Sequence, residues 1–158
     1  MPGVMRGVMR GALVAGAWAA WLGCVTMGMQ VLTSHLLPPH ILLVEDEPLQ
    51  RELMAESLSL AGYEVTATCT GDEAAILLAD RGGFDALLTD VAMPGRIDGI
   101  GLAEHAREVH PDLPVLFVSG GAASLRRAGA LPPPTACILK PFETGALLHA
   151  VRALMAGG

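Results

Sequence analysis

Between residues 41 and 139, five short strand-like runs alternate with segments of helical character, and this alternation constrains the fold more than any other feature. The runs span residues 41–44, 64–70, 84–89, 114–118 and 135–139, and the helical segments span 48–61, 71–80, 98–109, 122–130 and 143–155. Continuous apolar runs are typical of strands buried on both faces. Strands that alternate with helices predict a parallel sheet with helices on both faces. Residues 40–158 are therefore predicted to form one α/β domain.

Polar residues follow four of the five runs, at the point where each strand is predicted to end. Glu45 and Asp46 follow the first run, Asp90 the third, Ser119 the fourth and Lys140 the fifth. In an open parallel sheet, ligands bind at the carboxyl ends of the strands. We therefore expect these side chains to meet at one edge of the sheet, and we expect the second strand to lie at its border.

The residue types at these strand ends predict phosphoryl chemistry. Three carboxylates in one crevice repel one another unless a cation joins them, and Mg²⁺ suits such oxygen ligands. Lys140, the single lysine of the chain, and the hydroxyl of Ser119 supply a positive charge and a donor for an anion. Phosphoryl transfer uses such groups. A carboxylate can accept the phosphoryl group covalently, and Asp90 is the candidate because it starts a loop that Pro94 and Gly95 hold open.

Each of these residues also has a simpler interpretation. Glu45 and Asp46 are placed to cap the following helix and to favour its positive end. Asp90 and Lys140, taken singly, are compatible with surface charges, and Ser119 is compatible with the cap of a turn. The functional interpretation depends on four predicted strand ends carrying such residues together.

Four stretches of the sequence closely resemble the receiver domain of bacterial two-component response regulators. They are ILLVEDEP (41–48), LLTDVAMPG (87–95), VSG (118–120) and LKPF (139–142). The resemblance extends over residues 40–156, with the motifs in the family's order and at its spacing. It implies a flavodoxin-like, doubly wound (βα)5 fold whose five parallel strands lie in the order 2-1-3-4-5.

The resemblance also implies which residues bind the metal and the phosphoryl group. Asp90 would be the phosphoacceptor, modified by a histidine kinase or a histidine phosphotransfer protein. Asp46 and Asp90 would bind Mg²⁺ directly, Glu45 would bind it through water, and the backbone carbonyl of Ala92 would complete the protein ligands.

Lys140 and Ser119 would act on the phosphoryl group itself, by the same resemblance. Lys140 would pair with it, and Ser119 would swing to hydrogen-bond one of its oxygens. That movement would shift the face formed by segments 122–130, 135–139 and 143–155. The implied device is a two-state switch biased by a new charge.

Two positions depart from the family's pattern. Cys137 stands three residues before Lys140, where the family usually has an aromatic residue whose rotation reports activation. We interpret Cys137 as a small buried apolar residue, and we expect a switch that is weakly coupled or transmitted by backbone shift alone. Ala92 removes a polar side chain from the position two after the acceptor, where the family tunes the lifetime of the phosphoryl group.

The favoured function is a phosphorylatable single-domain response regulator, which turns over no independent substrate and so is not an enzyme. With no output domain after the last helix, its output would be a protein contact, further phosphotransfer or competition for a kinase. The alternative is a pseudo-receiver, which uses the same fold as a phosphorylation-independent interaction module. A phosphatase with a nucleophilic aspartate needs a second carboxylate two residues later, and Ala92 occupies that position.

Composition excludes several other classes. The formal net charge is −6, and residues 40–158 hold 8 basic and all 16 acidic residues, which disfavours DNA or RNA as a partner. Aromatic residues make up 4%, too few for a stacking platform on single strands. The three cysteines are widely spaced and indicate neither a disulfide framework nor a zinc site.

Residues 1–39 form an apolar extension that differs from the rest of the chain. Residues 11–34 carry no charged side chain and are long enough to cross a bilayer. Arg6 and Arg10 would hold the N-terminus inside and place the domain on the far side, away from a cytoplasmic kinase. We therefore favour an extension that is not normally translated, with the true start near Val31.

Two other interpretations of this extension stay open. Small residues recur at every fourth position, a spacing that lets two helices approach closely. One interpretation is thus a helix that packs on the domain or pairs with a second copy in a homodimer. The other is a membrane anchor through residues 11–34 with the opposite orientation. The domain is expected in the cytoplasm, membrane-associated only if that anchor is genuine.

Overall fold

The structure, a computed structural model, describes residues 37–81 and 83–157. The expectations for the apolar extension therefore lie, apart from its last three residues, outside the described residues. From Pro38 onward the chain forms one compact unit.

Strands and helices alternate along this unit, as the sequence predicts. The strands are β1 (His40–Val44), β2 (Glu64–Thr68), β3 (Ala86–Asp90), β4 (Val115–Ser119) and β5 (Thr135–Leu139). The helices are α2 (Pro48–Leu60), α3 (Gly71–Arg81), α4 (Gly99–Val109), α5 (Ala122–Ala128) and α6 (Thr144–Ala156).

The five strands form one parallel sheet in the order β2-β1-β3-β4-β5. This confirms the doubly wound α/β fold, and it places β2 at one border and β5 at the other. The central strands β1, β3 and β4 are almost completely buried. Their near-continuous apolar sequences follow from that burial, because helices cover both of their faces.

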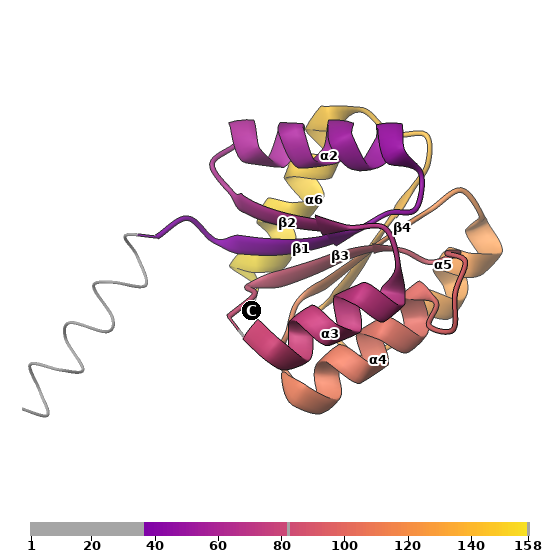
Figure 1. Cartoon of the computed structure of the whole chain (residues 1–158). Helices are drawn as coiled ribbons and strands as arrows, with labels where there is room; N and C mark the ends of the chain where they lie inside the picture. Colours follow the sequence, from indigo (N-terminus) through magenta and orange to yellow (C-terminus); the bar gives the residue numbers. More distant parts are fainter. Residues whose placement is uncertain (1–36, 82, 158) are drawn as a thin grey trace, which may run out of the picture. The chain divides into compact units, whose positions relative to one another are not determined.

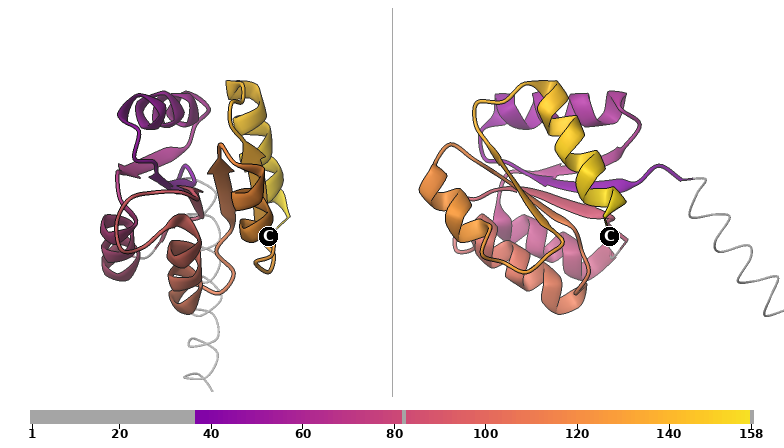
Figure 2. Two further views of the ribbon diagram at one scale, coloured as in Figure 1. Left: turned by 90° about the vertical axis from the view of Figure 1, so that its right-hand side faces the viewer. Right: turned by 180° about the vertical axis from the view of Figure 1, so that it is seen from behind.

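Two apolar cores lie on the two faces of the sheet. Side chains such as Leu87 and Phe117 pack against α3, α4 and α5 on one face. Side chains such as Leu88 and Leu116 pack against α2 and α6 on the other. Figure 1 shows α2 above the sheet and α3 and α4 below it, and Figure 2 shows the same layers from the side and from behind. Because side chains alternate along each strand, neighbouring residues of a strand belong to opposite cores.

The first helix after β1 begins as its sequence suggests but with a different cap. Pro48 occupies the first turn, where its missing N–H leaves no partner unsatisfied. The side chain of Glu47 caps α2, its Oε2 accepting the N–H of Gln50 at 2.8 Å. The expectation that Glu45 or Asp46 would cap this helix is therefore wrong, which leaves their carboxylates available elsewhere.

The interpretation of Cys137 as a buried residue is also wrong, because its side chain is exposed. Its strand, β5, lies at the border of the sheet. Among the described residues, the face that Cys137 shares with Phe117 is covered there by the seven-residue helix α5. The Sγ atom lies 3.8 Å from the carbonyl oxygen of Leu125 in that helix. Leu139, two residues further on the same face, is 49% exposed.

Most element boundaries differ from the prediction by one or two residues. The second strand ends at Thr68 rather than residue 70, and the third runs from Ala86 to Asp90, so that Asp90 itself belongs to β3. Within the described part of the chain, none of the helices has both the length and the apolar character that crossing a membrane requires.

Candidate functional site

Three strands place a charged side chain on the same side of the sheet, at its carboxyl edge. Val44 pairs with Thr89 in register, Asp90 with Val118, and Ser119 with Leu139. Because side chains alternate along a strand, Glu45, Asp90 and Lys140 follow Leu43, Leu88 and Ile138 on the face covered by α2 and α6. Regular strand geometry thus brings together groups that lie up to 95 residues apart.

Lys140 joins the two carboxylates. Its Nζ donates to Oε2 of Glu45 at 2.7 Å and to Oδ2 of Asp90 at 2.6 Å. The Lys140 side chain is 16% exposed, and that of Glu45 is 2% exposed. Charge-assisted hydrogen bonds this short and this buried are among the stronger polar contacts in proteins. The interpretation of Lys140 as an ordinary surface charge is therefore excluded.

Asp90 is held at both ends of its carboxylate and at its backbone. Oδ1 accepts the N–H of Ala92 at 2.8 Å, while Oδ2 faces Lys140. The hydroxyl of Thr89 donates to the carbonyl of Asp90 at 2.9 Å. Gly99 packs so closely that a Cβ there would overlap this same carbonyl oxygen. The end of β3 is thus fixed from three directions.

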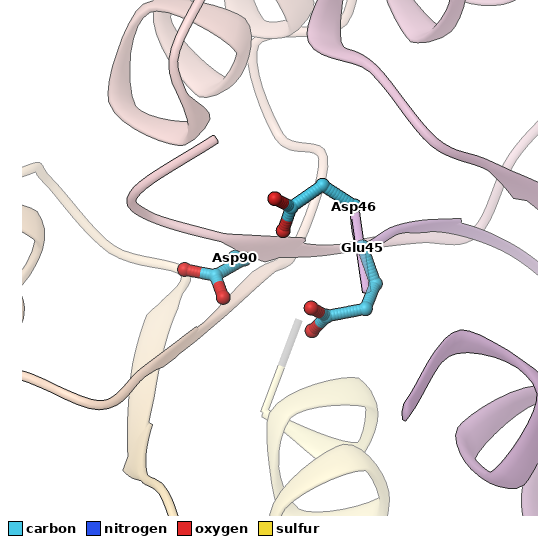
Figure 3. Close-up of side chains that lie close together, drawn as sticks. All are labelled: Glu45, Asp46 and Asp90. Carbon is cyan, nitrogen blue, oxygen red and sulfur yellow. The ribbon is translucent and has the colours of Figure 1, made fainter. Parts of the chain in front are cut away.

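Asp46 completes an acidic cluster with Glu45 and Asp90. Carboxylate oxygens of the three residues lie within 4.8 Å of one another, and the carboxyl groups of Glu45 and Asp46 extend toward Asp90 (Figure 3). Asp46 is more exposed than the other two. Three carboxylates and one ammonium leave a formal charge of −2. A hard divalent cation with oxygen ligands fits this donor set.

Burial and pairing shift two pKa values at this site. Burial raises the pKa of Glu45 above its ordinary value, and this outweighs the lowering by the hydrogen bond from Lys140. Burial acts to lower the pKa of Lys140, but the hydrogen bonds to Asp90 and Glu45 outweigh it, and the net effect is a raised pKa. Lys140 is therefore a cation throughout the neutral range.

Ser119 has a different partner from the other site residues. It is almost fully buried at the end of β4, and its Oγ accepts the N–H of Gly121 at 3.2 Å. This is the turn-capping contact that the simpler interpretation of the sequence allows. Its backbone lies beside the site, since its carbonyl accepts the N–H of Lys140 at 2.8 Å.

The structure adds Arg51 to the candidate site, a residue that the sequence did not single out. Its Nη1 donates to the backbone carbonyl of Glu45 at 2.7 Å and to that of Asp46 at 3.3 Å. One guanidinium in the first half of α2 thus fixes the backbone of the acidic loop. The sequence shows only that an arginine follows Asp46 by five residues. This does not predict the contact, because a backbone carbonyl can accept from an arginine whatever residue carries it.

Comparison with known proteins identifies the family. The model of the response regulator receiver domain matches residues 41–152. The response regulator receiver protein CpdR of Brucella abortus is 37% identical over 116 residues, which cover 73% of this chain and 95% of CpdR. The response regulator protein FleR of Pseudomonas aeruginosa is 38% identical over 112 residues, which cover 70% of this chain and 23% of FleR.

Solved structures of response regulators have the same fold as this chain. A response regulator receiver protein of Sinorhizobium medicae superimposes with a TM-score of 0.71 at 33% identity, covering 77% of this chain and 97% of its own. TrrA of Thermotoga maritima, solved with Mg²⁺ and BeF, gives a TM-score of 0.66 at 28% identity, covering 73% and 98%. The chain belongs to the response regulator receiver family, whose members act in bacterial two-component signalling.

Proposed function

We propose that this chain is a single-domain response regulator that accepts a phosphoryl group on Asp90 in a Mg²⁺-dependent reaction. The observation that carries the proposal is the arrangement of Lys140, which bridges Glu45 and Asp90 beside the Asp46 carboxylate. A cation-bridged carboxylate at the edge of a parallel sheet provides a nucleophile and a charge partner for an incoming phosphoryl group.

The proposed donor is a phosphohistidine on a histidine kinase or a histidine phosphotransfer protein. A carboxylate oxygen of Asp90 attacks phosphorus, the O–P bond of an acyl phosphate forms, and the P–N bond breaks. The departing electron pair remains on the imidazole nitrogen, which takes up a proton from solvent. No independent substrate is turned over, so the chain acts as a signalling domain rather than an enzyme.

The metal in this proposal is held by residues already grouped in the structure. Asp46 and Asp90 would bind Mg²⁺ directly, Glu45 would bind it through water, and the Ala92 carbonyl would be the fourth protein ligand. When bound, Mg²⁺ neutralises charge on the transferring phosphoryl group. The acidic cluster supports this assignment, as does the relative TrrA, which was solved with Mg²⁺ and BeF.

The proposed output is a change in the face formed by α5, β5 and α6. Ser119 would exchange its bond with the Gly121 N–H for one with a phosphoryl oxygen, while Lys140 would move from the Asp90 carboxylate to the phosphoryl group. Ser119 pairs with Leu139 of β5, and Lys140 directly follows β5, so both movements would shift this face. The exposed Cys137 and Leu139 lie there and would meet a protein partner in the cytoplasm.

A pseudo-receiver is the second candidate, and two observations favour it. Cys137 gives the proposed output face no aromatic side chain to reorient, and the hydroxyl of Ser119 is already engaged by Gly121. In this alternative the same face binds its partner without phosphorylation, and the charged cluster acts only to hold the strand ends together.

The two candidates are separated by incubating the full chain with acetyl phosphate and Mg²⁺ and reading the intact mass. We expect a gain of one phosphoryl group that EDTA prevents and that Asp90→Asn abolishes without unfolding the chain. Asp112→Asn is the matched control, because Asp112 is an exposed aspartate that precedes β4 at the opposite end of the strand. An absence of phosphorylation in the folded chain would favour the pseudo-receiver.

A further inference from the structure

The loop between β3 and α4, residues 91–98, follows the proposed phosphoacceptor directly. Its Ala92 N–H donates to Asp90 Oδ1 at 2.8 Å, so the position of this loop determines the orientation of the carboxylate. Val91 and Met93 are buried in the core below it. The N–H of Gly99 closes the loop at its base by donating to the carbonyl of Val91 at 3.1 Å. The outer part of the loop, around Gly95 and Arg96, is exposed.

A side chain from another helix holds that outer part. Asp72, in the first turn of α3, accepts the backbone N–H of Arg96 through Oδ2 at 3.2 Å. Its Oδ1 accepts from Nε of the same arginine, also at 3.2 Å. These contacts join groups 24 residues apart and connect α3 to the loop.

Two glycines show that α3 and this loop are in close contact. A Cβ at Gly71 would overlap the carbonyl oxygen of Ile97. A Cβ at Gly95, whose φ is +127°, would lie 3.0 Å from Oδ2 of Asp72. The start of α3 and the loop therefore approach as closely as their backbones permit, and the Asp72 carboxylate lies within that contact.

We propose that Asp72 is a positioning residue for the phosphoacceptor site, acting by holding the loop that carries Ala92. This inference rests on the proposed function, since it assigns Asp72 a role in metal binding and phosphoryl acceptance at Asp90. Without the bond to Arg96 N–H, the loop keeps its apolar anchors but loses its polar tether. The Ala92 backbone, which orients Asp90 and is the proposed fourth ligand, then samples a wider range of positions.

The hydrogen bond from the backbone N–H of Arg96 to Asp72, rather than the ion pair with the Arg96 side chain, is expected to hold the loop. The Arg96 side chain is 92% exposed, and ion pairs at such positions contribute little because water and salt screen them. The bond from a backbone N–H to a carboxylate needs no ordering of a long side chain. The side-chain ion pair is therefore expected to be dispensable, while an acceptor at position 72 is required.

Four variants of the full chain test this. Asp72→Ala removes the acceptor, Asp72→Asn keeps an acceptor but loses the charge, and Arg96→Ala keeps the backbone bond alone. Glu73→Ala is the matched control, since it removes the same charge from the same turn of α3 at an exposed position. Should Asp72→Ala melt near the assay temperature, Asp72→Ser replaces it: serine suits the first turn of a helix but is too short to reach the loop.

Two measurements are made on each variant: the Mg²⁺ dissociation constant by calorimetry without any phosphoryl donor, and the initial rate of phosphorylation by acetyl phosphate. We expect Asp72→Ala to weaken Mg²⁺ binding and slow phosphorylation, each about fivefold, which is the effect of losing one hydrogen bond of average net strength. The other three variants should stay within about twofold of the parent, because none of them removes that bond.

The outcomes distinguish this inference from the proposed function. Parent-like Mg²⁺ affinity in Asp72→Ala overturns the positioning role, as does an equal loss in Glu73→Ala, which would assign the effect to charge alone. If the parent chain binds Mg²⁺ but accepts no phosphoryl group, the proposed function fails, while a selective loss of affinity in Asp72→Ala still supports the positioning role.

Discussion

At the scale of single residues, Lys140 balances two carboxylates that burial would otherwise disfavour. Its ammonium contacts both Glu45 and Asp90, and its pKa in the folded chain is raised. A raised pKa for a lysine means that its stabilising contribution is fully present below the unfolded value of about 10.4 and is lost as pH rises through the folded pKa. Measurements at pH 7 therefore capture the whole contribution.

We expect Lys140→Met to lower the free energy of unfolding by about 2 kcal/mol at pH 7 in the absence of metal, because it leaves the Glu45 carboxylate buried without its partner. Adding Mg²⁺ should stabilise this variant more than the parent, since three carboxylates then face the cation without a competing ammonium. Urea unfolding with and without Mg²⁺ measures both effects. The control is Arg152→Met, which removes an exposed cation from α6. Equal stabilisation of variant and parent by Mg²⁺ would contradict a shared site.

At the scale of elements, the start of α4 and the end of β3 are packed without spare room. Gly99 opens α4, and its backbone lies directly against the carbonyl of Asp90. The end of β3, which carries Asp90, is thus positioned by a helix that contributes no side chain to the candidate site.

Gly99→Ala is expected to destabilise the chain by about 2–3 kcal/mol, because the new Cβ must displace the end of β3. It should also slow phosphorylation by acetyl phosphate. Gly145→Ala is the matched control: Gly145 also lies in the first turn of a helix, α6, and a Cβ there would meet nothing within 4 Å. That substitution should be neutral or stabilise by up to about 1 kcal/mol. Thermal melts of both variants make the comparison, and equal melting temperatures would refute the packing argument.

The sequence predicted the elements of this fold well because each carries its own signal. Continuous apolar runs marked the buried strands, and polar residues marked their ends, so that Asp90, Ser119 and Lys140 were placed correctly at the carboxyl edge. The meeting of Glu45, Asp90 and Lys140 was expected because the carboxyl ends of parallel strands lie at one edge of the sheet. These features depend on local pattern and on the geometry of parallel sheets.

Other features depend on tertiary contacts that no local pattern records. The exposure of Cys137 follows from how little of the border strand the short α5 covers, which the composition of β5 does not reveal. Asp72 accepts a backbone N–H of residue 96, and Arg51 donates to backbone carbonyls, so any sequence offers many equivalent candidates. The position of the Ser119 hydroxyl depends on a rotamer, and here it faces the N–H of Gly121.

At the scale of the whole molecule, the unit that begins at Pro38 contains every residue of the candidate site. We expect a chain lacking residues 1–30 to remain folded and to bind Mg²⁺ with unchanged affinity, because the apolar cores and the acidic cluster of the described residues lie beyond that point. Circular dichroism melts and Mg²⁺ calorimetry on the shortened and full chains check this. Loss of folding on deletion would show that the apolar extension belongs to the structure.

The distance along the chain between Glu45 and Lys140, 95 residues, has a consequence for biosynthesis. A ribosome that has produced the first four strands has already made the acidic groups at the ends of β1 and β3, but the ammonium that joins them has not yet been made. Domains of this kind fold as units once their non-local partners are present. A nascent chain can therefore complete this charged cluster only after residue 140 has left the exit tunnel, and a translation product truncated before that residue lacks the cation that joins Glu45 and Asp90.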